Sequence, residues 1–143
     1  MRIYILLFLV ILIAGSCNEK IFTYNVNCDE CYYPEPDSAD LVIKVTINDR
    51  FDAVPLVIFK GNVEDNNIEY VDTAYASPHY VWVRVDQKYA VRAKYEKSNA
   101  NLFVVDGTKL KSSLVKDECE GGECYIIEDE DIDVSIKDEF TNF

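Results

Sequence analysis

The sequence predicts an all-β domain that folds as an antiparallel β-sandwich of seven or eight short strands. Three observations favour this fold class. Apolar residues recur at every second position in several windows, turn-forming residues separate those windows at hairpin spacing, and no window keeps a helical period. Each alternating strand has one face to bury, and two packed sheets cover all of those faces.

The first three expected strands lie in the first half of the folded part. Residues 41–47 alternate apolar and polar side chains, and residues 48–49 mark a turn. Residues 54–59 are almost continuously apolar, which is typical of a strand that is covered on both faces. A second turn at residues 65–67 leads to a weaker strand over residues 68–74.

The clearest strand signal lies at residues 80–85, where three valines share one face and Tyr80 and Trp82 share the other. Residues 86–87 are the expected hairpin link to the next strand, over residues 89–95.

Three shorter strands complete the prediction. Residues 102–105 form one, and residues 106–107 close it as a turn. Residues 124–127 and 132–136 are expected to pair with each other across an acidic turn. The folded domain therefore covers residues 39–143.

The run from Lys88 to Tyr95, Lys-Tyr-Ala-Val-Arg-Ala-Lys-Tyr, is similar to the tyrosine-bearing strand of immunoglobulin-like and prealbumin-like modules attached to bacterial surface proteins. The resemblance covers eight residues. It implies a sandwich fold of one of these two kinds and carries no function.

The N-terminus has the three parts of a secretory signal: a positive residue, Arg2, a short apolar run and small residues before a cut. The apolar run extends from Ile3 to Ala14. A helix of that length rises about 18 Å, which is well short of the roughly 30 Å of a hydrocarbon core. We therefore predict that residues 1–16 are a signal peptide.

The end of this segment, Ile13-Ala-Gly-Ser-Cys17, resembles the bacterial lipobox. It departs from the commonest form at Ala14, where Leu is usual. The resemblance implies that the chain is cleaved just before Cys17, which becomes the new N-terminal residue. Its thiol would then carry diacylglycerol, which anchors the chain to a membrane. Residues 17–38 would then form a lipid-anchored tether. In the best-known sorting rule for such lipoproteins, Asp directly after the cysteine retains the protein in the inner membrane. This chain has Asn18 there, so we expect it in the outer membrane, on the periplasmic face or at the cell surface.

Four further cysteines form two pairs in the sequence, Cys28 with Cys31 and Cys119 with Cys124. An even count in an exported chain indicates disulfides, and four cysteines allow three connectivities. Cross-pairing would close loops of around 90 residues. A zinc site and a redox-active CxxC are the alternatives, and the acidic residues beside the thiols disfavour both.

The composition is strongly acidic, with 26 Asp and Glu against 14 Lys and Arg and a formal net charge of −12. A field of this sign repels phosphate backbones, so we do not expect nucleic acid as a partner. No stretch is rich in Lys or Arg, and the sequence therefore argues against a basic patch that binds an anionic membrane.

The sequence contains no recognisable catalytic motif, and we expect no enzyme, cofactor or metal. His79 is the only histidine, whereas most general-base and zinc-enzyme mechanisms use His. Ser77, Ser112 and Ser113 lie in no nucleophile elbow. The acidic run at residues 128–131 lacks the spaced oxygens and glycine of a calcium loop.

The candidate contact residues are Tyr75, Tyr80 and Trp82, because grouped amphipathic rings suit sugar or protein recognition. Burial of this face beneath the tail at residues 140–143 is the favoured alternative. The expected function is a non-enzymatic binding module for a protein or glycan partner at the cell envelope. An accessory structural subunit is the alternative, followed by a thiol-redox or metal-handling lipoprotein.

Overall fold

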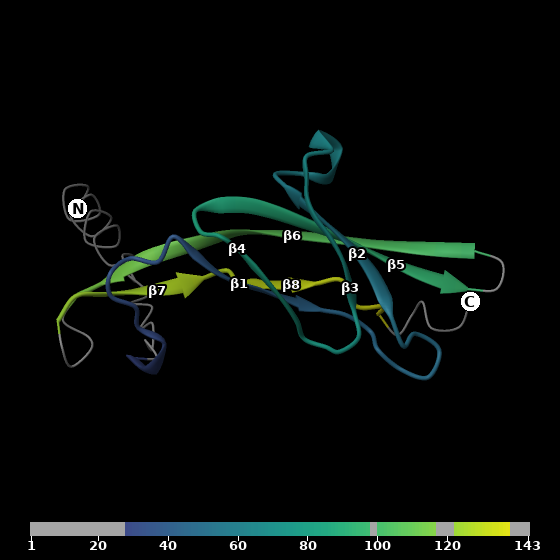
Figure 1. Ribbon diagram of the computed structural model, residues 1–143, viewed down its shortest axis with the longest axis horizontal. Helices are drawn as coiled ribbons and strands as arrows, with labels where there is room; N and C mark the ends of the chain where they lie inside the picture. The colour runs from purple at the N-terminus through teal and green to yellow at the C-terminus, as the bar shows by residue number, and fades with distance from the viewer. Residues whose placement is uncertain (1–27, 98–99, 117–121, 138–143) are drawn as a thin grey trace, which may run out of the picture.

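The computed structural model describes residues 28–97, 100–116 and 122–137, which form two β-sheets packed face to face (Figure 1). Two short 3₁₀ helices, η1 (Cys28–Glu30) and η2 (Val63–Asp65), accompany eight strands in this part of the chain. The strands are β1 (Ser38–Lys44), β2 (Val54–Lys60), β3 (Ile68–Ala74), β4 (His79–Arg84), β5 (Gln87–Lys97), β6 (Ala100–Val115), β7 (Cys124–Glu128) and β8 (Asp131–Asp133). The predicted all-β sandwich is confirmed.

The smaller sheet has the strand order β4-β1-β8. β4 runs antiparallel to β1, whereas β8 runs parallel to it. The parallel pair departs from the purely antiparallel expectation, because the chain enters β8 from the other sheet and not through a hairpin. In a constant-type immunoglobulin fold the first two strands pair within one sheet, whereas β1 and β2 lie in different sheets here.

The larger sheet has the order β3-β2-β5-β6-β7, and all of its neighbours are antiparallel. The first part of the long strand β6 pairs with β5 and its last part pairs with β7. The predicted turn at residues 106–107 is therefore wrong, since both residues lie inside β6. A Cβ atom on Gly107 would stand 2.8 Å from the carbonyl oxygen of Tyr89. Glycine at this point allows β5 to approach closely.

Two predicted hairpins are also wrong. β4 and β5 belong to different sheets, so the link at residues 85–86 crosses from one sheet to the other. Asp86 allows the crossing with a left-handed φ of 55°. β7 pairs with β6 and β8 pairs with β1, so the segment at residues 129–130 is a second crossing. Alternation predicts which side chains are buried, but it does not name the neighbouring strand.

The core lies between the sheets and is built from every second residue of the facing strands. Tyr95 on β5 ties the two sheets together. Its hydroxyl donates to the carbonyl oxygen of Val134 at 2.8 Å and accepts the backbone N–H of Thr46 at 3.0 Å. Fully buried members of this core include Leu41, Ile43, Leu56, Ile58, Val91, Leu110 and Ile132.

The described segment before β1, residues 28–37, contacts the larger sheet. Tyr32 and Tyr125 exchange two backbone hydrogen bonds, of 2.8 and 2.9 Å, which adds one residue pair beyond the β7 edge. The Ser112 hydroxyl donates to the Glu35 carboxylate at 2.5 Å. Residues 17–27 of the predicted tether, and the predicted signal peptide, lie outside the described residues. Among the described residues, no helix has the length and apolar character needed to cross a membrane.

Candidate functional site

The outer face of the smaller sheet carries two exposed aromatic side chains. Val81 and Val83 of β4 are buried in the core, so the residues between and before them point outward. Tyr80 is 57% exposed and Trp82 is 62% exposed. Both rings are therefore largely exposed beside the described residues. Residues 140–143, which were expected to cover this face, lie outside the described residues.

Polar groups border the two rings on the neighbouring strand. Asp40 of β1 lies directly opposite Trp82, and Val42 lies opposite Tyr80. Arg84 follows Trp82 on the same face and is exposed. We call the set Asp40, Tyr80, Trp82 and Arg84 the aromatic face. It offers two ring surfaces with a carboxylate and a guanidinium beside them, an arrangement that suits a ligand with both apolar and hydroxyl-bearing sides.

Tyr75 lies apart from this set. It belongs to the link between β3 and β4 and is 72% exposed. The same link is tied to the end of β1, because the backbone N–H of Val45 donates to the Ser77 hydroxyl at 3.1 Å. Of the three predicted contact residues, the fold therefore brings two onto one face and leaves the third on a connecting segment.

Carboxylates on and beside β8 make this side of the sandwich acidic. The pKa of Glu130 is raised by burial and then by the nearby charges of Asp131, Glu30 and Asp40. The pKa of Asp133 is lowered to about 2, first by the Lys137 ammonium and then by Ser135. Desolvation and neighbouring carboxylates thus raise one pKa on this side, while a lysine and a serine lower the other.

His79 lies at the edge of the sandwich and contacts a carboxylate on the other sheet. Its Nε2 is 3.0 Å from Oδ2 of Asp72. The pKa of Asp72 is lowered, chiefly because its carboxylate accepts the backbone N–H of Thr73, and His79 adds to the effect. Among the described residues, no hydroxyl or thiol hydrogen-bonds the His79 ring. This contact joins β4 of the smaller sheet to β3 of the larger sheet.

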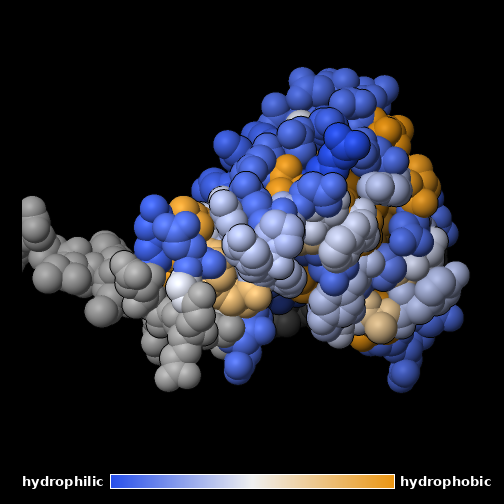
Figure 2. Space-filling view, turned by 60° about the vertical axis from the view of Figure 1, so that its left-hand side comes forward, coloured by the Kyte–Doolittle hydropathy of each residue, from blue (hydrophilic) through white to orange (hydrophobic). Residues whose placement is uncertain are grey.

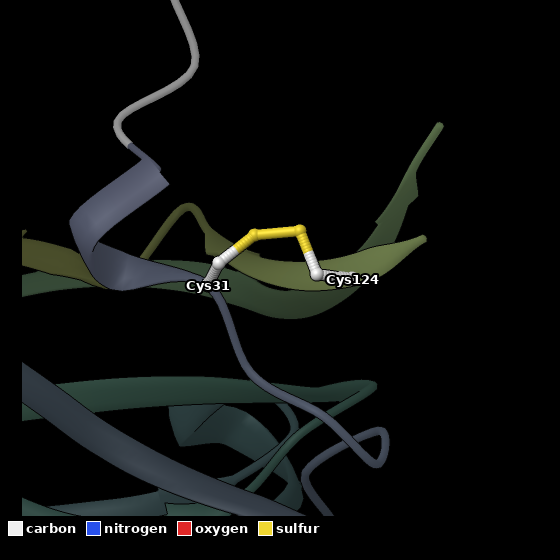
Figure 3. Close-up of a disulfide and its surroundings, with 2 residues drawn as sticks. All are labelled: Cys31 and Cys124. Atoms are coloured by element: carbon white, nitrogen blue, oxygen red, sulfur yellow. A yellow bond between two sulfur atoms is a disulfide. The ribbon is translucent and has the colours of Figure 1, made fainter. Parts of the chain in front are cut away.

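One disulfide links a cysteine before β1 to a cysteine near the end of the described sequence. Cys31 and Cys124 form a disulfide, with their Cα atoms 5.7 Å apart (Figure 3). Cys31 packs against a small cluster of Val115, Cys124 and Ile126 that is separate from the main core. Cys31 is thus bonded to the late strand and not to Cys28. Cys17 and Cys119 lie outside the described residues, within which no group of three metal-ligating side chains occurs.

A shallow depression of about 450 Å³ lies beside the aromatic face, and sequence reasoning missed it. Its lining includes Glu35, Asp37, Arg84 and Asp86. The first two residues fall in the segment that the sequence predicts as a tether. The pairing of Ser38 with Arg84 and the backbone hydrogen bond from Val85 to the carbonyl oxygen of Asp37 bring that segment beside the end of β4.

Exposed hydrophobic side chains occur on several elements of the described chain, among them Tyr70, Tyr80, Trp82 and Phe103. Figure 2 shows a face on which separate hydrophobic patches are surrounded by hydrophilic side chains. The fold and the site together define an all-β sandwich with an exposed aromatic face. No protein-family model matches the chain, and neither a curated protein nor a solved structure matches it.

Proposed function

We propose that this chain is a lipid-anchored protein of the bacterial cell envelope whose sandwich domain is a non-enzymatic binding module. The anchor is the lipid on Cys17, which the lipobox-like sequence implies. The observation that carries the binding role is the exposure of Tyr80 and Trp82 side by side in register with Asp40 and Val42. Such large rings are usually buried or placed where a partner covers them.

The chemistry of the aromatic face favours a glycan as the ligand. The face of a ring packs against the apolar C–H side of a sugar, while a carboxylate accepts its hydroxyl hydrogens. Asp40 lies directly opposite Trp82 and supplies that acceptor beside the ring. A protein partner at the envelope would use the same rings as anchors, and binding measurements separate the two ligands.

Trp82 makes the test direct, because it is the only tryptophan in the chain. Its fluorescence therefore reports on this face alone. We expect a saturable change on titration with oligosaccharides from envelope polysaccharides, and Tyr80→Ala should weaken the affinity roughly tenfold. Tyr33→Ala is the matched control, since Tyr33 is 84% exposed and lies outside β4. A spectrum that no glycan changes, together with a protein cross-linked through position 82, would identify a protein ligand instead.

A further inference from the structure

The outer face of the larger sheet gathers positive charge that the sequence disperses. Val91 and Ala93 of β5 are buried in the core, so Arg92 between them points outward. Lys88 has the same parity as Arg92, and Lys109 of β6 lies directly opposite Lys88. Because basic residues recur at alternate positions on two strands, no stretch of the sequence is rich in them.

These three cations are not neutralised within the described part of the chain. Lys88 donates to the side-chain oxygen of Asn62 at 2.6 Å, which is a neutral acceptor. None of the three makes an ion pair with a described residue, whereas five other lysines each pair with a carboxylate: Lys44, Lys94, Lys111, Lys116 and Lys137. Like charges directly opposite each other destabilise a sheet. An anion supplied from outside would relieve the repulsion between Lys88 and Lys109.

Apolar side chains, two of them exposed, lie beside Arg92. The Arg92 guanidinium lies 5.3 Å from the ring centre of Phe59 and 5.7 Å from that of Phe103. Phe103 is 53% exposed, and Val105, directly opposite Arg92, is 51% exposed. We call the set Lys88, Arg92, Phe103, Val105 and Lys109 the basic face. Cations mixed with apolar side chains match a surface that has anionic headgroups above hydrocarbon.

The N-terminal segment meets the larger sheet on this same side. Ile127 of β7 packs on the main core, so its neighbour Ile126 points to the outer side. Cys31 packs with Ile126 and is bonded to Cys124, which places the start of the domain over the outer side of β7. The chain between Cys17 and Cys28 spans at most about 40 Å when fully extended. A membrane that holds Cys17 is therefore within reach of this face.

We propose that the basic face docks on the anionic lipid surface to which the chain is anchored, an inference that rests on the lipid anchor proposed above. Each Lys or Arg held at an anionic surface strengthens the attraction about fivefold, within a screening length of about 10 Å at 0.1 M salt. The aromatic face lies on the opposite side of the sandwich. Docking through the basic face leaves Trp82 directed away from the membrane, towards its ligand.

Lysine labelling of the full lipidated chain in vesicles tests the docking. One set of vesicles is phosphatidylcholine alone, and the other also contains phosphatidylglycerol. A membrane-impermeant acylating reagent is applied to both, and the modified lysines are read by mass spectrometry. Labelling of Lys88 and Lys109 should fall about threefold or more on the anionic vesicles, and high salt should restore it. Lys44, on the outer face of the smaller sheet, is the internal control and should label equally on both.

Charge reversal provides the matched variants. In the double variant Lys88→Glu and Lys109→Glu, Lys94, another lysine on the outer face of β5, should lose its protection on anionic vesicles. Lys44→Glu should leave the protection of Lys88 and Lys109 unchanged. Equal labelling of Lys88 and Lys109 on both vesicle types, or equal protection of Lys44, would overturn the proposal.

Flotation separates a failure of docking from a failure of the anchor. A chain that floats with phosphatidylcholine vesicles but labels equally on both types is anchored without docking. A chain that floats only with the anionic vesicles contradicts the lipid anchor and supports the basic face. A chain that floats with neither contradicts both.

Discussion

Cys31 and Cys124 are 93 positions apart in the sequence, yet their Cα atoms lie 5.7 Å apart and their sulfur atoms are bonded. The bond joins the segment before β1 to the first residue of β7. The chain that precedes Cys28 therefore leaves the domain from a defined place on the larger sheet. In the proposed anchored chain, that place is where the tether from Cys17 joins the domain.

Replacing both of these cysteines should destabilise the domain. In the chain-entropy model, a bond that closes a loop of this length stabilises the fold by on the order of 4 kcal/mol, and measured values are typically about 2–4 kcal/mol. We expect Cys31→Ala with Cys124→Ala to lower the free energy of unfolding by about that amount in non-reducing urea titrations. Tyr33→Ala serves as an exposed control with little effect. A peptide map that joins Cys31 to Cys28 would show that the pairing is different.

The Tyr95 hydroxyl should contribute more to the free energy of unfolding than the hydroxyl of an exposed tyrosine does. Tyr95 is 1% exposed, and its hydroxyl serves the backbone groups of both Thr46 and Val134. Tyr95→Phe leaves a donor and an acceptor without their partner, which costs about 1–3 kcal/mol. Tyr70→Phe, at a side chain 42% exposed, should change the free energy of unfolding by less than about 0.5 kcal/mol. Equal effects of the two substitutions would contradict the assigned role.

Asp133 should make the fold sensitive to acid. Its pKa is lowered to about 2, chiefly by Lys137 and then by Ser135. A carboxyl group with a lowered pKa in the folded state stabilises the fold above its unfolded pKa, near 3.8, and this contribution is lost as the pH falls towards 2. The side chain is 42% exposed, so screening limits the contribution to about 0.5–1 kcal/mol.

Denaturation at a series of pH values measures this effect. The free energy of unfolding of the native chain should fall more steeply between pH 4 and 2 than that of Asp133→Asn. Parallel curves for the two chains would show that Asp133 does not contribute.

Glu130 should have the opposite effect. Its pKa is raised by burial and then by Asp131, Glu30 and Asp40. A carboxyl group with a raised pKa destabilises the fold once it ionises, so its unfavourable effect grows as the pH rises above the unfolded value of 4.5. Glu130→Gln should therefore increase the free energy of unfolding at neutral pH, by about 0.5 kcal/mol or less after screening. A decrease on this substitution would contradict the electrostatic account of this side.

The alternation of side chains predicted the fold class and the burial of individual residues. Val81 and Val83 are buried and Trp82 lies on the opposite face because a strand has a period of two. Alternation did not predict whether that opposite face is exposed. Strand pairing was not predictable in the same way. Asp106-Gly107 is typical of a turn, but Gly107 lies within β6. Glycine is needed there because the carbonyl oxygen of Tyr89 approaches its backbone closely.

The grouping of the rings on the aromatic face could be predicted from the sequence, whereas the basic face could not. Tyr80 and Trp82 lie two positions apart on one strand, so local periodicity was enough to group them. Lys88 and Lys109 are brought together by the pairing of β5 and β6. Net charge and local composition contain no information about such a pairing, and the strongly acidic total of −12 concealed a basic face.

Both proposals include the proposed lipid anchor, and mass spectrometry of the protein purified from bacterial membranes tests that anchor most directly. The measurement is the mass and fragmentation of the N-terminal peptide. We predict a mature chain that begins at Cys17 with diacylglycerol on the thiol and an acylated amino group. An N-terminal peptide that retains residues 1–16, or one that begins at Cys17 with an unmodified thiol, would contradict the account.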